Sequence, residues 1–235
     1  MKQGKEVENL LEKTRYQFED LVEITQILRS ENGCPWDREQ THQTIRSCMI
    51  EETYEAVEAI DTENASLLRE ELGDVLFQVI FHAQIEAEQG VFDIENVIHD
   101  ICVKMIRRHP HVFSNVSVSE AEEAIARWEQ IKTEEKQRTT RAARLRAVPS
   151  MLPALMRAQK IVKKAGISEN VSTEELRNRL HASVASFEAT TSDETLGELL
   201  LSVAAVANGF DLDAERALAV ATENVILQVE VAEGK

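Results

Sequence analysis

The sequence contains few of the residues that end helices and form turns. Its 235 residues include 8 glycines and 4 prolines, and the three aromatic types together make up 5%. Ala, Leu, Glu and Ile are abundant, a composition that favours helix. No convincing strand pattern is present, since VFSNVSV (112–118) is short and isolated. We therefore predict an all-α fold of one or two domains.

Cysteine is scarce, and long apolar runs are absent. The three cysteines, Cys34, Cys48 and Cys102, are widely spaced and form no CxxC pair, which is typical of reduced thiols. No stretch approaches the roughly 20 apolar residues that a membrane span needs. The first residues, MKQGKEVENL, do not resemble a signal peptide. We therefore expect a cytoplasmic protein without a membrane partner.

Positive charge is also in short supply. Lys and Arg number 26 against 42 Asp and Glu, so the formal net charge is −16. This acidity argues against nucleic-acid binding, which needs a basic surface. It does not exclude a small anionic substrate that metal ions bridge. The segment from Lys136 to Lys164 is an exception, with nine basic residues and no acid. We interpret it as a solvated hinge between two halves.

Apolar residues at helical spacing predict five helices in the first half of the chain. Asn-Gly and proline in ENGCPWD (31–37) separate the first helix from the second, and Gly90 ends the third helix. Asp93 is expected to cap the fourth, which stops before His109-Pro110. The expected ranges are 7–30, 39–60, 65–89, 93–108 and 119–137.

The second half of the chain repeats the apolar pattern of the first but lacks several of its acidic residues. EELGDVLFQVIFHA (70–83) aligns with ETLGELLLSVAAVA (194–207), and FDIENVI (92–98) with the start of FDLDAERAL (210–218). This is a tandem duplication. Thr195 replaces Glu71 and Glu198 replaces Asp74, while 176–187 contains no carboxylate. The acids are therefore not required for the fold.

Four acidic residues of the first half are expected to converge. Glu52 and Glu55 are three residues apart on one predicted helix, as are Glu71 and Asp74 on the next. The four-residue turn 61–64 favours antiparallel packing of these helices. Carboxylates so close together repel unless a cation intervenes, and all-oxygen ligation suits Mg²⁺ or Mn²⁺. The alternative is that these are ordinary solvated helix faces.

A basic group follows in KMIRRHPHVF (104–113). Lys104, Arg107 and Arg108 together could bind a polyphosphate opposite a metal–carboxylate cluster. Cations that favour a helix C-terminus are an equally good explanation. The second half has no basic residue at the corresponding place, TENVILQVE (222–230).

In this order, NGCPWD, EETYE, EELGD and KMIRRHPHVF resemble the MazG family of nucleoside triphosphate pyrophosphohydrolases. The resemblance covers nearly the whole chain and implies tandem all-α bundles that dimerise. The implied reaction converts a nucleoside triphosphate and water to a monophosphate and pyrophosphate. The second half departs from the family because it lacks the acids and the basic run, so we predict a catalytic N-terminal domain (1–135), a basic linker (136–152) and a degenerate C-terminal domain (153–235) with a structural or regulatory role. Few side chains near the predicted site can read a base edge, which favours broad base specificity.

The resemblance also assigns roles to residues. Glu52, Glu55, Glu71 and Asp74 would hold Mg²⁺, and Glu51 would be an accessory ligand or would orient water. Glu51 or Glu52 would accept the proton from water, and Lys104, Arg107 and Arg108 would bind phosphate. Trp36 would stack on the base or merely pack, while Asn32 and Asp37 would orient substrate or cap the next helix.

Two other functions remain open from the sequence. A di-iron carboxylate bundle needs ExxH motifs on two helices, and Glu39-x-x-His42 is the single match, outside the acidic cluster. A non-catalytic helical interaction or regulatory module would use its charge for solubility. There is no P-loop motif, so P-loop ATPase chemistry is excluded.

Overall fold

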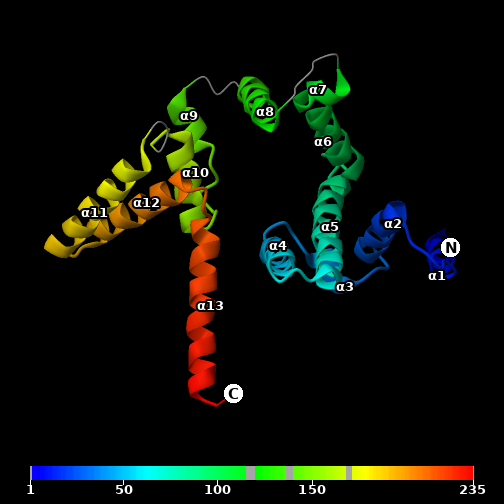
Figure 1. The fold of residues 1–235 in the computed structure, drawn as a ribbon. Helices are drawn as coiled ribbons and strands as arrows, with labels where there is room; N and C mark the ends of the chain where they lie inside the picture. The colour runs from blue at the N-terminus through cyan, green and yellow to red at the C-terminus, as the bar shows by residue number, and fades with distance from the viewer. Residues whose placement is uncertain (1, 115–119, 136–139, 168–170, 235) are drawn as a thin grey trace. The chain divides into compact units, whose positions relative to one another are not determined.

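The computed structural model describes residues 2–114, 120–135, 140–167 and 171–234, which are helical and contain no strand (Figure 1). The predicted all-α class is therefore confirmed. The chain divides into two compact units, residues 1–119 and 120–235. Because the boundary lies at residue 120, the fifth predicted helix (119–137) and the predicted linker (136–152) both belong to the second unit.

The first unit is built around a pair of long helices. Its helices are α1 (Lys2–Leu11), α2 (Phe18–Arg29), α3 (Pro35–Glu39), α4 (Arg46–Asp61), α5 (Ala65–Glu88), α6 (Ile94–Arg108) and α7 (Pro110–Phe113). The turn between α4 and α5 contains Glu63 at φ 53°. Asn64 then caps α5 by accepting a hydrogen bond from the Leu67 amide. This tight reversal packs α5 back along α4.

Several predicted helix ends are confirmed and two predicted helices are wrong in extent. Asp93 caps α6 in a reciprocal bond with Asn96, and Gly90 follows α5 at φ 70°. The predicted helix 7–30 is two helices, because Gln17 and Asp20 form a capping box that starts α2. The predicted helix 39–60 begins only at Arg46, because Thr41 and Thr44 bond to each other and form a turn.

The core of the first unit lies where the start of α4 meets the second half of α5. Ile45, Phe81 and Ile85 are buried there, and Phe77 packs edge-on against Phe81. Ile45 is 3% exposed and immediately precedes α4. Ala56 and Ala59, further along α4, are buried as well, so apolar packing continues toward the α4–α5 turn.

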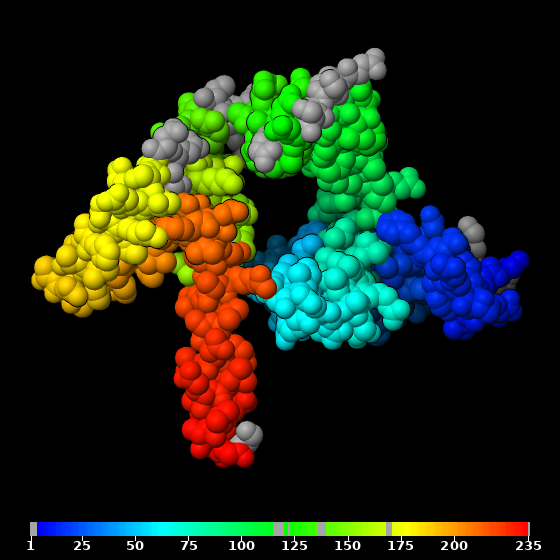
Figure 2. Space-filling view, in the orientation of Figure 1, coloured from blue at the N-terminus to red at the C-terminus, as the bar shows by residue number. Residues whose placement is uncertain are grey.

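The second unit is also helical in the part that the structure describes. Its helices are α8 (Ala121–Glu135), α9 (Arg141–Arg146), α10 (Ala154–Lys164), α11 (Thr173–Ala189), α12 (Asp193–Gly209) and α13 (Ala214–Ala232). Val162, Leu176 and Ala205 form its core, between α10, α11 and α12. Figure 2 shows α13 projecting beyond these helices with its surface open on the face in view.

Within the described residues, no single helix is long and apolar enough to cross a membrane. The pair α12 and α13 meets the length and composition criteria only together, and it is bent by 109° at the junction.

Candidate active site

Three glutamates of the first unit form one cluster. Carboxylate oxygens of Glu52 and Glu55 on α4 and Glu71 on α5 all lie within 4.8 Å of one another. Glu71 is 7% exposed, Glu52 is half-buried and Glu55 is exposed. The three-residue spacing on α4 and the tight α4–α5 turn bring them together, as the sequence predicts. We call Glu52, Glu55 and Glu71 the carboxylate cluster.

The cluster concentrates negative charge at the edge of the core. Burial, followed by the charges of Asp74 and Glu55, raises the pKa of Glu52 above its usual range. Burial and the charge of Glu55 do the same to the pKa of Glu71. A hydrogen bond with Glu55 contributes to both shifts. The ionised cluster is thus unfavourable by itself and would be relieved by a cation.

The donor set of the cluster fits a hard divalent cation. All its ligand atoms are carboxylate oxygens, which Mg²⁺ and Mn²⁺ prefer over imidazole or thiolate. The exposed position of Glu55 leaves the cluster open to solvent on one side. A cation held there would keep free coordination positions for water or a phosphate oxygen.

Asp74 and Glu51 flank the carboxylate cluster. Both side chains are exposed and lie outside the set of three. The charge of Asp74 contributes to the raised pKa of both Glu52 and Glu71, and Glu51 contributes to that of Glu52. Both carboxylates therefore add to the negative charge around the cluster.

The basic residues of α6 differ in exposure. Lys104 and Arg107 are exposed, whereas Arg108 is 6% exposed. Among the described residues, the causes that raise the pKa of Glu52 and Glu71 are burial and other carboxylates, with no basic side chain. The proposed phosphate contact of these three residues stays a prediction.

The predicted substrate loop has mixed exposure. Trp36 is 62% exposed, so its ring does not pack into the chain's own core. Asn32 is exposed and Asp37 is buried. Cys34 is the residue that precedes α3 as its N-cap, and Asp37 lies within that helix. The roles expected for Asn32 and Asp37 stay predictions.

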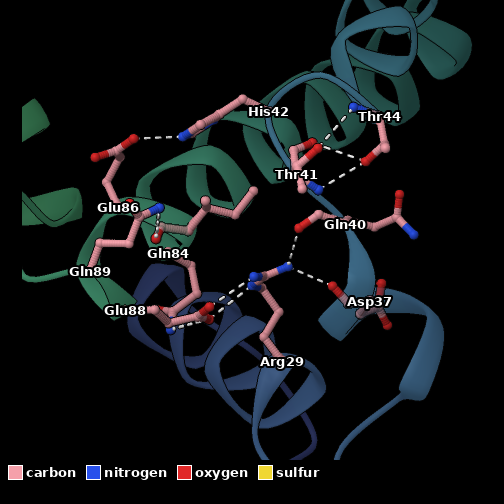
Figure 3. Close-up of polar contacts among 11 residues, drawn as sticks. Arg29, Asp37, Gln40, Thr41, His42, Thr44, Gln84, Glu86, Glu88 and Gln89 are labelled. Carbon is pink, nitrogen blue, oxygen red and sulfur yellow. Dashed lines mark hydrogen bonds and ion pairs between the residues drawn. The ribbon is translucent and has the colours of Figure 1, made fainter.

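Sequence reasoning missed the residue that holds this loop in place. Arg29, at the end of α2, donates two hydrogen bonds of 2.8 Å to the carboxylate of Glu88 on α5 (Figure 3). It also donates to the backbone carbonyls of Asp37 and Gln40, at 2.5 and 3.2 Å. Glu88 is 59 residues away in the chain, so no local pattern could have revealed this contact.

Gly33 allows the same loop to pass close to α2. A Cβ atom at this position would lie 2.2 Å from the Ile27 carbonyl oxygen and 2.3 Å from that of Leu28. Backbone atoms cannot give way as a flexible side chain can. The loop that leads into α3, the short helix with Trp36, thus depends on glycine at this position.

We expect Gly33→Ala to destabilise the protein by about 1–3 kcal/mol, because the new methyl group overpacks against the backbone. Urea unfolding followed by circular dichroism measures the change. Gly73→Ala in α5 is the matched control, since a Cβ there meets nothing within 4 Å. It should stabilise the helix by up to about 1 kcal/mol. Equal stability of Gly33→Ala and wild type would refute the close approach.

The second unit uses the corresponding positions differently. Thr195, which replaces Glu71, lies in the first turn of α12 and forms a capping box with Ser192. Its hydroxyl donates to the Thr190 carbonyl at 2.6 Å. Glu198, which replaces Asp74, is exposed. Among the described residues of this unit, no group of three potential metal ligands comes together.

Comparison with known proteins agrees with this arrangement. A family model described as the MazG nucleotide pyrophosphohydrolase domain matches residues 40–113, which include the carboxylate cluster. The nucleoside triphosphate pyrophosphohydrolase of Escherichia coli K12 is 43% identical over 219 residues, covering 88% of this chain and 83% of the relative. The nucleoside triphosphate pyrophosphohydrolase/pyrophosphatase MazG of Thermotoga maritima is 39% identical over 220 residues, covering 89% and 82%.

The family model matches within the first unit, and the two relatives cover most of the chain. These similarities favour an enzyme over a non-catalytic helical module. The chain belongs to the MazG family of nucleotide pyrophosphohydrolases.

Proposed function

We propose that the protein is a Mg²⁺-dependent nucleoside triphosphate pyrophosphohydrolase whose active site lies in the first unit. The observation that carries the proposal is the carboxylate cluster, where two glutamates have raised pKa values at the junction of α4 and α5. The family match covers this junction, and the relatives named above carry the same activity in their names.

The carboxylate cluster and Asp74 would hold the metal. Glu71 is buried and Glu52 half-buried, so their positions are fixed by the packing of α4 on α5. Glu55 and Asp74 are exposed and can adjust to the ion and to substrate. When bound, Mg²⁺ supplies charge neutralisation at the phosphate oxygens and lowers the pKa of water. Mn²⁺, with the same preference for oxygen, should substitute.

The chain's own residues would then manage the water and its proton. Water attacks a phosphorus atom beside the oxygen that bridges the α- and β-phosphates. The bond between that phosphorus atom and the bridging oxygen then breaks. The proton from water passes to a carboxylate oxygen of Glu51 or Glu52. Glu51 is exposed beside the cluster, and Glu52 has a pKa already shifted toward neutral by burial. The products are a nucleoside monophosphate and pyrophosphate.

Other parts of the first unit would bind the rest of the nucleotide. Lys104 and Arg107 are exposed and could contact phosphates, with Arg108 supporting them from its buried position. The exposed ring of Trp36 could stack on the base, with Asn32 and Asp37 orienting the sugar or base. Stacking accepts every base, which supports broad specificity.

We also propose that two copies of the chain associate. Large apolar side chains on the helices of the carboxylate cluster are exposed in the single chain, and a partner copy would cover them: Ile50, Tyr54, Val57, Ile60, Leu72 and Leu76. The second unit would have a structural or regulatory role, since its helices lack the acids. The three free cysteines fit the cytoplasm.

Product analysis tests the proposed reaction. Purified protein would be given Mg²⁺ and ATP, GTP, CTP, UTP, the deoxynucleotides or ITP, and pyrophosphate would be distinguished from orthophosphate. We expect monophosphate and pyrophosphate in equal amounts from several bases, and none after chelation of the metal. Orthophosphate as the first product would place the cleavage at a different bond and contradict the proposal.

A further inference from the structure

A second polar junction fastens the start of α4 to α5, on the side of the core away from the carboxylate cluster. The segment Gln40–Ile45 leads from α3, which carries Trp36, into α4. We call residues 31–39 the Trp36 loop. Its backbone is held by Arg29, and its His42 side chain reaches α5 (Figure 3). The same segment therefore connects the predicted base-binding loop to the helix that carries Glu52 and Glu55.

His42 lies between two residues of α5. Its Nδ1 is 2.7 Å from Nδ1 of His82, and its Nε2 is 2.7 Å from a carboxylate oxygen of Glu86. The two imidazole planes are within 7° of parallel. His82 and Glu86 are four residues apart on α5, so they share one face. His42, His82 and Glu86 form what we call the histidine clamp.

The geometry limits how many protons the histidine clamp can hold. The carboxylate of Glu86 only accepts, so Nε2 of His42 must carry hydrogen. The facing Nδ1 atoms then share one hydrogen, whether the pair is neutral or carries one positive charge. A further proton would place hydrogen on both Nδ1 atoms. Their hydrogen bond would be lost, and two cationic rings would face each other.

We propose that the histidine clamp holds the segment before α4 against α5 near neutral pH and releases it in mild acid. His42 is thus a positioning residue for the Trp36 loop and for the start of α4. The clamp itself does not depend on the proposed hydrolysis, although its effect on turnover does.

The direction of the pH effect follows from His82. Burial, followed by the charge of His42, lowers the pKa of His82 from its usual value near 6.5. Because the folded protein resists this protonation, the stabilising contact is present above pH 6.5. It is lost as the pH falls from there through the pKa of His82 in the folded protein.

Two carboxylates of α5 lie beside the histidine clamp. Glu86 faces His42 from α5 itself, and Glu88 lies two residues further along α5. Glu88 is paired with Arg29 of α2, and this hydrogen bond and that of Gln84 hold the pKa of Glu88 below its usual range against the effect of burial. The Arg29–Glu88 pair is therefore a permanent second fastening, and it supplies a matched control.

Fluorescence of Trp36 tests the histidine clamp directly. The chain has two tryptophans, Trp36 and Trp128, and Trp128→Phe leaves a single reporter on the loop. Acrylamide quenching and anisotropy would be followed from pH 8 to pH 5. We expect a one-proton transition below pH 6.5, in which the ratio of released to held loop changes up to about tenfold per pH unit.

Variants separate the clamp from general acid effects. His82→Gln keeps a donor toward His42 but cannot titrate, so its Trp36 signal should stay constant across the range. Glu88→Gln alters the neighbouring fastening and should leave the midpoint of the transition in place. As a second readout, carbon-13 NMR of the histidine rings in wild type should show one ring titrating below the usual range.

Three results would overturn the proposal. The first is a Trp36 signal in wild type that does not change with pH, and the second is an identical transition in His82→Gln. The third is a transition metal that copurifies in stoichiometric amount and whose removal changes Trp36, since the facing Nδ1 atoms would then be metal ligands. Absence of hydrolysis would refute the proposed function only, because the fluorescence readout needs no substrate.

Discussion

Replacing Glu52 with glutamine is expected to lower pyrophosphate release at least about 100-fold, since loss of a residue that merely supports metal ligands already costs 10- to 100-fold. Glu52 contributes a ligand atom to the carboxylate cluster and is half-buried, so no water can take its place without disturbing α4. Initial rates with saturating Mg²⁺ and nucleotide measure the effect.

The same substitution should increase the stability of the metal-free protein. It removes a carboxylate whose ionisation is opposed by burial and by Asp74 and Glu55. Lower activity combined with a higher Tm excludes unfolding as the cause. Glu58→Gln is the control, because Glu58 lies on the same helix, is exposed and is outside the carboxylate cluster. If Glu52→Gln and Glu58→Gln had equal activity, the first unit would not contain the active site.

The stabilisation conferred by Mg²⁺ is expected to grow with pH between about pH 5 and 8. Without metal, Glu52 and Glu71 have raised pKa values in the folded protein. Their favourable contribution is complete below the unfolded pKa near 4.3 and is lost as the pH rises through the folded pKa. With metal, the same deprotonation creates the ligands, so binding stabilises the folded state more at higher pH.

Thermal unfolding with and without Mg²⁺ at several pH values measures this difference. At a hundredfold excess over Kd, the bound ion should add about 2.7 kcal/mol to the free energy of unfolding. The Glu52→Gln variant should show a much smaller pH-dependent gain, and Ca²⁺ serves as a comparison for ion size. A gain in Tm that is independent of pH would show that the ion binds away from these glutamates.

The sequence predicted the helices whose ends carry local signals. Asp93, Gly90 and the four-residue turn before α5 each act through their own neighbours, so α5 and α6 lie where expected. The breaks at Gln17 and at Thr41–Thr44 were missed, because neither contains the proline or glycine that usually marks the end of a helix. Side-chain bonds to the backbone, rather than proline or glycine, interrupt the helix there.

The candidate site was predictable to the same extent. Glu52, Glu55 and Glu71 meet because helix periodicity and one short turn are sufficient to place them. The contacts that support the adjoining loop could not be foreseen, since Arg29 and His42 find partners on α5 that are 59 and 40 residues away. Such contacts depend on how α2 and the loop pack on α5, which no spacing rule in the sequence specifies.

Crystals of the full chain grown with Mn²⁺ and examined by anomalous diffraction would test the central claim most directly, because Mn²⁺ reports its own position. The account predicts an anomalous peak about 2.1 Å from carboxylate oxygens of Glu52, Glu55 and Glu71. It also predicts no corresponding peak on α11 or α12. A peak found only elsewhere, for example between His42 and His82, would contradict the assignment of the active site to the carboxylate cluster.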